Sequence, residues 1–224
     1  CLGVPVNVHA RIKEPVAKTS PLSKQGMTGH CLRLIGKGDN TKEQSSYDVA
    51  VVGLGYVGLP LCLAFAKAGS RVLGLDIDEK KIANLQAGNS YIQHISSAEI
   101  QAVQEQASLT AAMDFSQAAQ AAAVLICVPT PLTVNRTPDL SYVKSTTRAL
   151  APFLRHGQLI VLESTTYPGT TDEVIKPILE EGSGLVAGKD FFLAYSPERE
   201  DPGNPKSNFS DCPKVVGGLS DQCL

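Results

Sequence analysis

The chain has 224 residues, of which 43% are hydrophobic and 19% charged, and its formal net charge is −2 at pH 7. These values are typical of a globular chain with one sizeable domain, or one domain and a piece of another. The nearly neutral charge argues against a nucleic-acid partner. Since no apolar run approaches the ~18 residues of a membrane span, we also expect no membrane partner.

Residues 1–46 differ from the rest of the chain in composition. They mix Pro, Gly, Ser, Thr and Lys with little periodicity, and seven basic against three acidic residues give them a net charge of +4. We interpret them as a poorly ordered extension, with a partner-binding arm as the alternative. The remaining residues then carry a net charge of −6, so an anionic ligand would have to be bound by local devices.

Six cysteines are spread over the chain with neither metal-ligand spacing nor a Cys-x-x-Cys pair. Cys62 and Cys127 lie inside apolar runs, where a buried reduced thiol is the simplest expectation. This pattern predicts no metal site and a reducing compartment, the cytoplasm.

Apolar runs alternate with helical periodicity from Tyr47 onward. Strands are expected within residues 49–52, 71–76, 122–131, 158–165, 190–198 and 214–218. Helices are expected within residues 56–68, 79–87, 96–107, 139–154 and 170–181. In the first helix we expect a buried face made of Val57, Leu61, Ala64, Phe65 and Ala68. Strands that are apolar on both faces and alternate with helices predict an α/β, Rossmann-like, doubly wound parallel sheet with helices on both faces.

A glycine motif, G-L-G-Y-V-G, follows the first expected strand directly. Gly53 permits a tight turn, Gly55 lets the backbone approach a pyrophosphate, and Gly58 allows the helix to pack closely on the strand. The motif alone is weak evidence, but Asp76 ends the next strand 18 residues beyond Gly58, close to the expected ~20. The helix N-terminus would hold the pyrophosphate and Asp76 the adenosine ribose, which favours NAD, although Lys80 and Lys81 keep NADP open.

Five ordered segments carry a more specific resemblance. They are VVGLGYVGLPL (51–61), GNSYIQHI (88–95), ICVPTPL (126–132), LESTTYPGTT (162–171) and YSPEREDPGNP (195–205). On these segments the chain resembles the UDP-glucose/GDP-mannose dehydrogenase family, and it is most similar to the UDP-N-acetylglucosamine (or -mannosamine) 6-dehydrogenase branch. We therefore expect an NAD-binding domain at residues 47–218 and the start of a truncated central or C-terminal region at 219–224.

The resemblance implies a set of site residues. It places the cofactor at Gly53, Gly55, Tyr56, Val57, Gly58, Asp76, Lys81, Val128, Pro129, Thr130 and Thr165. It also implies that Thr165, with Thr166 as the alternative, takes part in the chemistry, and that Glu198 is a base or water activator. Glu198 and Arg199 would contact the substrate, Arg199 through its planar fork. Glu163 is either a cofactor contact or a strand-end acid.

Members of this family oxidise a sugar C6 alcohol to a carboxylate in two hydride transfers to NAD, through a cysteine thioester. The polar SPEREDPGN segment, which is apolar in UDP-glucose dehydrogenases, favours a UDP-hexosamine, UDP-N-acetylglucosamine above others. None of the six cysteines matches the family's nucleophile, so we expect this cysteine and a catalytic lysine beyond Leu224, and NAD binding without turnover by this chain alone. The full-length protein is expected to be a homo-oligomer. Alternatives are another NAD(P)-linked, hydroxyacid-type dehydrogenase, or a non-catalytic NAD-sensing module.

Overall fold

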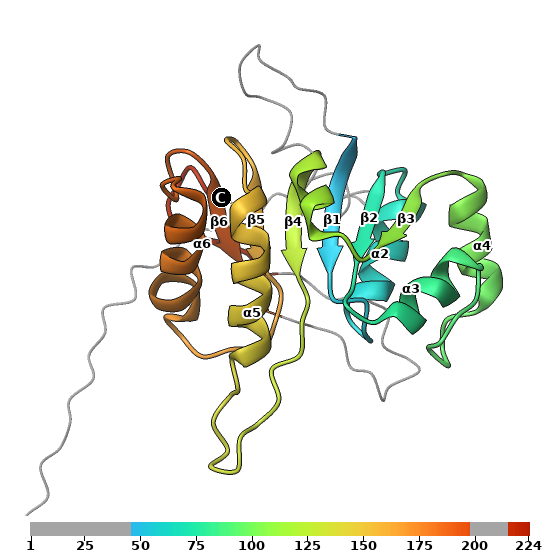
Figure 1. The fold of residues 1–224 in the computed structure, drawn as a ribbon, viewed down its shortest axis with the longest axis horizontal. Coiled ribbons are helices and arrows are strands. Elements are labelled where there is room, and N and C mark those ends of the chain that lie inside the picture. Colours follow the sequence, from blue (N-terminus) through green and yellow to red (C-terminus); the bar gives the residue numbers. More distant parts are fainter. Residues whose placement is uncertain (1–45, 198–214) are drawn as a thin grey trace, which may run out of the picture.

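One seven-stranded sheet organises the protein (Figure 1). The computed structural model describes residues 46–197 and 215–224. The strands stand in the order β3-β2-β1-β4-β5-β6-β7. Their bounds are β1 Tyr47–Val52, β2 Val72–Leu75, β3 Leu109–Ala112, β4 Ala121–Ile126, β5 Leu159–Leu162, β6 Phe192–Tyr195 and β7 Gly217–Gly218. All neighbouring pairs are parallel except β6 and β7, which are antiparallel.

Helices cover both faces of this sheet. Their bounds are α2 Gly58–Lys67, α3 Glu79–Gln86, α4 Ser97–Glu105, α5 Ser141–Leu150 and α6 Lys176–Ser183. Shorter helical segments are the 3₁₀ turns η1 Phe115–Gln120 and η2 Ala151–Phe153 and the π-helical segment η3 Thr170–Ile175. One apolar cluster joins the sheet to α2, α3 and α4, and a second joins the other face to α5 and α6, which lie in front of the sheet in Figure 1. The predicted α/β, Rossmann-like, doubly wound fold is thereby confirmed.

Local signals place the starts of α3 and α4. Asp78 caps α3 by accepting hydrogen bonds from the N–H groups of Lys80 and Lys81. Ser96 caps α4, and Glu99 completes a capping box by bonding back to the Ser96 N–H, as its spacing from the serine predicts. None of the helices in the described part of the chain is long and apolar enough to cross a bilayer.

The expected buried face of the first helix is confirmed in part. Leu61 is buried, and Val57 and Phe65 are half-buried and pack against the same apolar cluster, whereas Ala68 is exposed. The other buried residues of α2 are Gly58, Leu59, Cys62, Leu63 and Ala66. Because α2 packs against β1, β2 and also α4, two faces of it are covered and a single-face pattern misplaces its core.

The expected helix over residues 170–181 is divided in two. A π-helical segment, η3, comes first, and α6 then begins with Pro177 in its first turn. Since η3 ends at Ile175 and α6 begins at Lys176, the proline lies where the π-helical segment passes into the α-helix. Proline has no N–H to donate, so one helical hydrogen bond is missing at this junction.

Candidate functional site

The strands of both halves of the sheet end in register at one edge. Leu75 of β2, Val52 of β1, Ile126 of β4 and Leu162 of β5 are aligned in one row across the sheet. The residues that follow them, Asp76, Gly53, Cys127 and Glu163, leave the sheet side by side. The chain reverses its winding direction between β1 and β4, and the carboxyl ends of parallel strands at such a reversal are where doubly wound proteins bind ligands.

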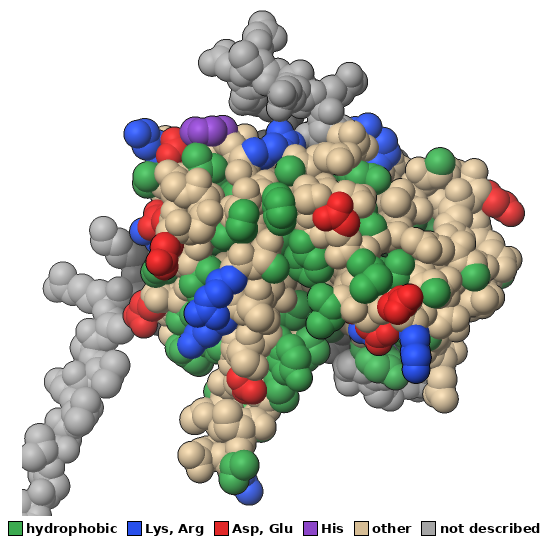
Figure 2. Space-filling view, in the orientation of Figure 1, with side chains coloured by type: hydrophobic (Ala, Val, Ile, Leu, Met, Phe, Trp, Pro, Cys, Tyr) green, Lys and Arg blue, Asp and Glu red, His purple; other side chains and the backbone are tan. Residues whose placement is uncertain are grey.

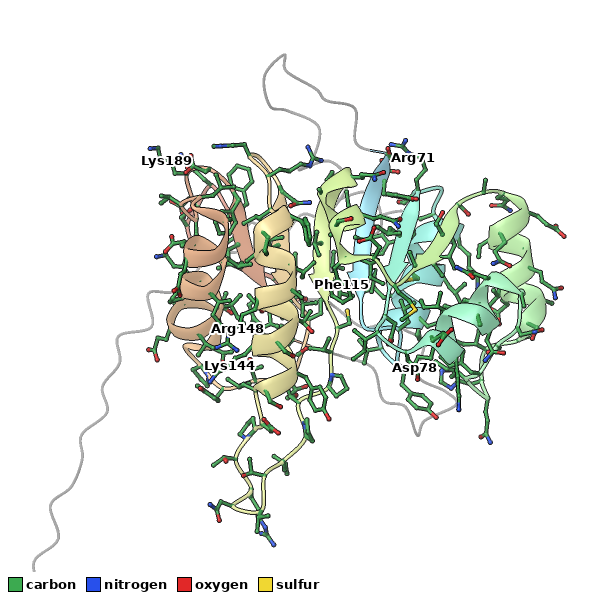
Figure 3. All side chains as sticks on the ribbon, in the orientation of Figure 1. Arg71, Asp78, Phe115, Lys144, Arg148 and Lys189 are labelled. Atoms are coloured by element: carbon green, nitrogen blue, oxygen red, sulfur yellow. The ribbon has the colours of Figure 1, made fainter. Side chains whose placement is uncertain are left out.

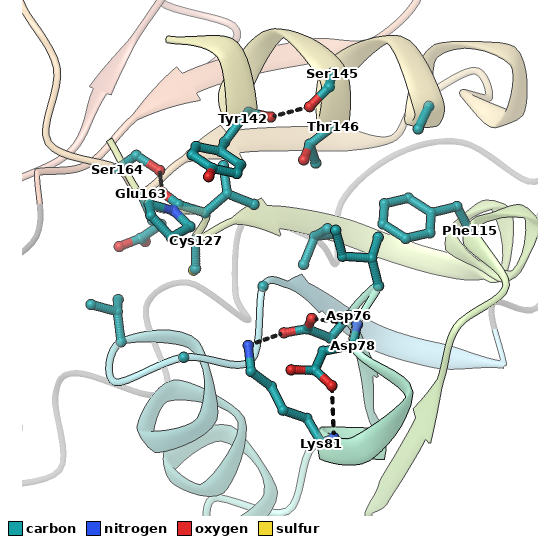
Figure 4. Close-up of a pocket in the computed structure, with 18 of the residues that line it drawn as sticks. Asp76, Asp78, Lys81, Phe115, Cys127, Tyr142, Ser145, Thr146, Glu163 and Ser164 are labelled. Atoms are coloured by element: carbon teal, nitrogen blue, oxygen red, sulfur yellow. Dashed lines mark hydrogen bonds and ion pairs between the residues drawn. The ribbon is translucent and has the colours of Figure 1, made fainter. Parts of the chain in front are cut away.

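A cleft of about 1400 Å³ opens at this edge (Figure 4). Figure 4 shows Phe115 of η1 and Thr146 of α5 pointing toward it from neighbouring elements. Large, solvent-exposed apolar side chains also line the cleft, namely Tyr56, Ile77, Met113, Tyr142 and Phe153. Figure 2 shows hydrophobic side chains gathered between the two halves of this face. Exposed apolar surface concentrated in one concave place is typical of a ligand site.

Residues 53–58 form a segment that we call the glycine turn. Each of its three glycines is needed for a different structural reason. Gly53 has φ of 94°, and a Cβ there would lie 2.8 Å from the carbonyl oxygen of Cys127. A Cβ on Gly58 would overlap the carbonyl oxygen of Gly53, so only glycine lets α2 approach β1 this closely. A Cβ on Gly55 would meet no atom of the described residues within 4 Å. Since none of these residues requires glycine at Gly55, the approach of a ligand is the physical reason for it.

Asp76 is buried and is bonded on both carboxylate oxygens. Oδ2 accepts from the Leu54 N–H at 2.7 Å and from Lys81 Nζ at 2.9 Å, and Oδ1 accepts from the Asp78 N–H at 3.0 Å. A carboxylate offers about four acceptor positions, so one stays available to a ligand hydroxyl. Figure 3 shows Asp78 at the cleft end of the sheet and Arg71 at the opposite end.

The ends of β4 and β5 are tied together by hydroxyl groups. Thr130 Oγ1 donates to the carbonyl oxygen of Thr165 at 2.6 Å, and Ser164 Oγ donates to the carbonyl oxygen of Val128 at 2.7 Å. Beside them the carboxylate of Glu163 is buried and lines the cleft. These bonds place the predicted Thr130 and Thr165 on a common wall.

The N-terminus of α2 is suited to an anion. The helix begins in the glycine turn without a side-chain cap and without an acidic residue in its first turn. The unpaired N–H groups and the positive end of the helix dipole therefore face the turn. A pyrophosphate fits here, while Asp76, at the end of the neighbouring strand, fits a ribose with free hydroxyls and repels a 2′-phosphate. The residues present thus fit NAD.

Most of the expected site residues line the cleft together. They are Gly53, Gly55, Tyr56, Val57, Asp76, Lys81, Val128, Pro129, Thr130 and Thr165. Gly58 is buried behind the turn, where it shapes the helix approach instead of lining the cleft. Glu198 and Arg199 lie outside the described residues. The described residues include no cluster of three or more potential metal ligands.

Several lining residues were not expected. Phe115 follows a strand that the sequence did not reveal, and Tyr142, Ser145 and Thr146 form the α5 wall. Tyr91 also lines the cleft, and it belongs to the segment 88–95 that carries part of the family resemblance. An amphipathic pattern marks the buried side of α5, but it does not tell which of its polar residues face a ligand.

Comparisons with known proteins agree with this geometry. The model of the UDP-glucose/GDP-mannose dehydrogenase family, NAD binding domain, matches residues 47–224. A UDP-N-acetyl-D-glucosamine 6-dehydrogenase of Pseudomonas aeruginosa is 38% identical over 170 residues, which are 76% of this chain and 39% of that protein. A UDP-N-acetyl-D-mannosamine dehydrogenase of Pyrococcus horikoshii is 37% identical over 178 residues, 78% of this chain and 41% of that protein.

A solved structure gives the same relation in three dimensions. The GDP-mannose dehydrogenase of Pseudomonas aeruginosa, crystallised as a ternary complex, superposes with a TM-score of 0.72 at 31% identity, covering 79% of this chain and 42% of that one. The chain thus spans about two fifths of the length of the relatives it matches. By its family match, its sheet order and its glycine turn, the chain belongs to the UDP-glucose/GDP-mannose dehydrogenase family, of which residues 47–224 match the NAD-binding domain.

Proposed function

We propose that this chain supplies the cofactor half of a nucleotide-sugar 6-dehydrogenase, which oxidises the C6 alcohol of a UDP-hexosamine to the uronate. The observation that carries the proposal is the cleft itself. It runs from Asp76 and the open side of Gly55 to Thr165, so one wall fits an adenosine diphosphate and the other adjoins the strand ends where a substrate would meet the nicotinamide.

Each residue of the site has a proposed task. Backbone N–H groups at Gly55, Tyr56 and Val57 hold the pyrophosphate, and Asp76 accepts from the ribose hydroxyls. Lys81 fixes the Asp76 carboxylate through its 2.9 Å ion pair, which also occupies the ammonium group that a 2′-phosphate would need. Bound NAD supplies the hydride acceptor for an alcohol.

The opposite wall orients the reacting groups. The carbonyl oxygen of Thr165 is held by Thr130, so the Thr165 segment is fixed at the end of β5. We assign to Thr165 a positioning and catalytic role beside the nicotinamide. We assign to Glu198 the role of base, and to Glu198 and Arg199 the contacts to the substrate, on the S-P-E-R match in the sequence.

UDP-N-acetylglucosamine is the substrate we favour. The polar SPEREDPGN segment supports an N-acetylated hexosamine, and relatives named for UDP-N-acetyl-D-glucosamine and for UDP-N-acetyl-D-mannosamine are both similar to the chain. The proposal includes a domain at residues 47–218, a following region that begins at 219–224, a cytoplasmic homo-oligomer, and a nucleophilic cysteine outside this chain.

Calorimetric titration of this chain with NAD and NADP tests the cofactor half. We expect NAD to bind at least about tenfold more tightly than NADP, because the Asp76 carboxylate would face the 2′-phosphate. Asp76→Ala should weaken NAD and narrow this ratio. Equal affinities for both cofactors in the unmodified chain would contradict the assignment of Asp76.

Turnover assays test the substrate half. With NAD and UDP-N-acetylglucosamine, the chain alone should form no uronate, because it contains no cysteine that matches the family nucleophile. In the full-length protein, kcat/KM for UDP-N-acetylglucosamine should exceed kcat/KM for UDP-N-acetylmannosamine. The reverse order would remove the substrate assignment while leaving the NAD site intact.

A further inference from the structure

The segment between α3 and α4 returns to the glycine turn and contacts it twice. The hydroxyl group of Tyr91 donates a 2.6 Å hydrogen bond to the carbonyl oxygen of Leu54. The ring of His94 lies 6.2 Å from the ring of Tyr56, centroid to centroid. Residues 88–95 therefore brace the turn from 37 residues further along the chain, a role that the proposed chemistry does not use.

Leu54, between the first two glycines, is fixed on three sides. Its N–H donates to Asp76 at 2.7 Å, and its carbonyl oxygen accepts from Tyr91. Its side chain is 1% exposed and packs close to Gly74, where a Cβ would come within 3.1 Å of it. A residue held by both backbone polar groups and by its side chain has little freedom to rotate.

The peptide group carries this restraint to the next residue. The carbonyl oxygen of Leu54 and the N–H of Gly55 belong to one planar, trans peptide group, in which they point in opposite directions. Tyr91 therefore sets the direction of the Gly55 N–H by holding the oxygen on the other side. Among the described residues, no backbone carbonyl accepts from the Gly55 N–H, and no atom lies within 4 Å of the place that a Cβ of Gly55 would occupy.

Tyr91 is well suited to be a permanent donor. The residue is half-buried against the apolar cluster under α2. Burial, and then the nearby Asp76, raise the pKa of the Tyr91 hydroxyl well above its usual value, so the proton stays on oxygen. Since a carbonyl oxygen only accepts, this proton lies between the two atoms.

We propose that Tyr91 is a positioning residue for the cofactor, which aims the Gly55 N–H at the pyrophosphate through the Leu54 carbonyl group. The inference rests on NAD binding at this cleft and deepens it. It predicts that Tyr91 affects the affinity for some ligands and not for others. Ligands with phosphates depend on Tyr91, whereas a ligand that has adenine and ribose alone binds through Asp76 and does not.

The test is Tyr91→Phe, which keeps the ring and removes the hydroxyl. The dissociation constants of NAD, ADP and adenosine are measured by calorimetry for the full chain and the variant. Loss of one preorganised hydrogen bond should raise the constants for NAD and ADP about five- to tenfold. The constant for adenosine should change less than about twofold, which a general loosening of the fold would not produce.

Ser108→Ala is the matched control. Ser108 Oγ is buried and donates to the carbonyl oxygen of Val103 at 2.8 Å, at the start of β3 and so at the other end of the sheet. The control should lower the melting temperature by a similar amount and leave all three constants unchanged. If it weakened NAD as much as Tyr91→Phe does, a loss of stability would account for both, and the proposal would fail.

Other outcomes would overturn the role of Tyr91 or the NAD site itself. Unchanged NAD and ADP binding in Tyr91→Phe, or an equal loss for adenosine, overturns the role of Tyr91 while the NAD site stands. A wild-type chain that binds none of the ligands overturns the NAD site and this inference with it. Should Tyr91→Phe not fold, the wild-type amide resonance of Gly55 gives the answer: it should shift with ADP and stay in place with adenosine, and the opposite pattern would sink the proposal.

Discussion

The two halves of the sheet build their walls of the cleft in different ways. In the first half, β1 to β3 with α2 to α4, side chains grip the backbone of a turn: Asp76 and Tyr91 hold Leu54. In the second half, β4 to β6 with α5 and α6, hydroxyl groups tie neighbouring strand ends to each other, as Thr130 does with Thr165. The first arrangement presents backbone donors to an anion, and the second sets the spacing of two loops. Loss of a hydrogen bond in the first arrangement should therefore lower cofactor affinity, and loss of one in the second should lower stability.

Replacing Gly58 and Gly55 one at a time should separate the loss of stability from the loss of NAD affinity most sharply. Gly58→Ala would place a Cβ on the carbonyl oxygen of Gly53, so α2 must move from β1; overpacking of this kind costs about 1–3 kcal/mol or more. We expect a large drop in melting temperature and no measurable NAD binding. Gly55→Ala, with open space at the Cβ, should retain the melting temperature within a few degrees and still lose about tenfold or more in NAD affinity. Thermal melts and calorimetry on both variants measure these quantities. A Gly55→Ala variant that melts early, or that binds NAD as tightly as the unmodified chain does, would contradict the prediction.

Removing a hydroxyl from the second half should have a smaller effect. Thr130→Val deletes the hydrogen bond to Thr165 at the end of β5, which is worth about 0.5–1.5 kcal/mol of unfolding free energy. The dissociation constant of ADP should stay within about twofold, in contrast to the expectation for Tyr91→Phe. Denaturant unfolding and ADP titration measure both quantities. A tenfold loss of ADP affinity would show that the halves are not independent.

The smallest expected effect is a change in how the free energy of unfolding depends on pH when Glu99 is replaced. A hydrogen bond from Lys67, helped by the Ser96 cap, holds the pKa of Glu99 below its usual value, despite some burial. Because the folded pKa is lower than the unfolded one, the pair stabilises above the unfolded value of about 4.3 and this contribution disappears as pH falls through the folded value. The pair is largely exposed, so we expect less than about 1 kcal/mol. Unfolding of Glu99→Gln between pH 6 and pH 3 should depend less on pH than that of the wild type.

Glu105→Gln, on the same helix, serves as the control, because Glu105 forms no ion pair within the described part of the chain. Its unfolding should follow the wild-type pH profile. A profile for Glu99→Gln that also coincides with the wild type would show that the contact between α2 and α4 contributes nothing measurable.

Much of the fold could be predicted because its signals are local. The glycine turn, the capping box at Ser96 and the apolar runs of β1 and β4 each lie within a few residues of the structure they produce. For β3 no such signal exists. Its four residues, LTAA, are short and only partly buried, and the turn before it has a positive φ at Ala107, where a glycine would have marked the helix end.

The site residues likewise fall into those that could be predicted from local sequence signals and those that could not. The glycines and Asp76 could be predicted because their spacing follows from one strand–turn–helix–strand unit, and Lys81 because of the family resemblance. Tyr91 and the α5 wall could not, since their places depend on how separate elements pack. In a sequence, a tyrosine 37 residues from the turn carries no sign that its hydroxyl reaches Leu54.

The contact between Gly53 and Cys127 has a consequence for the order in which the protein can be assembled. Both hydrogen bonds that hold the Leu54 backbone come from residues up to Tyr91, so the half-sheet that emerges first from synthesis already contains these restraints on its turn. The carbonyl oxygen that forbids a side chain at Gly53 belongs to Cys127, on a strand made later. In a nascent chain, alanine at Gly53 would meet only the strain of the positive φ, and the clash with Cys127 would add to it as β4 joins the sheet.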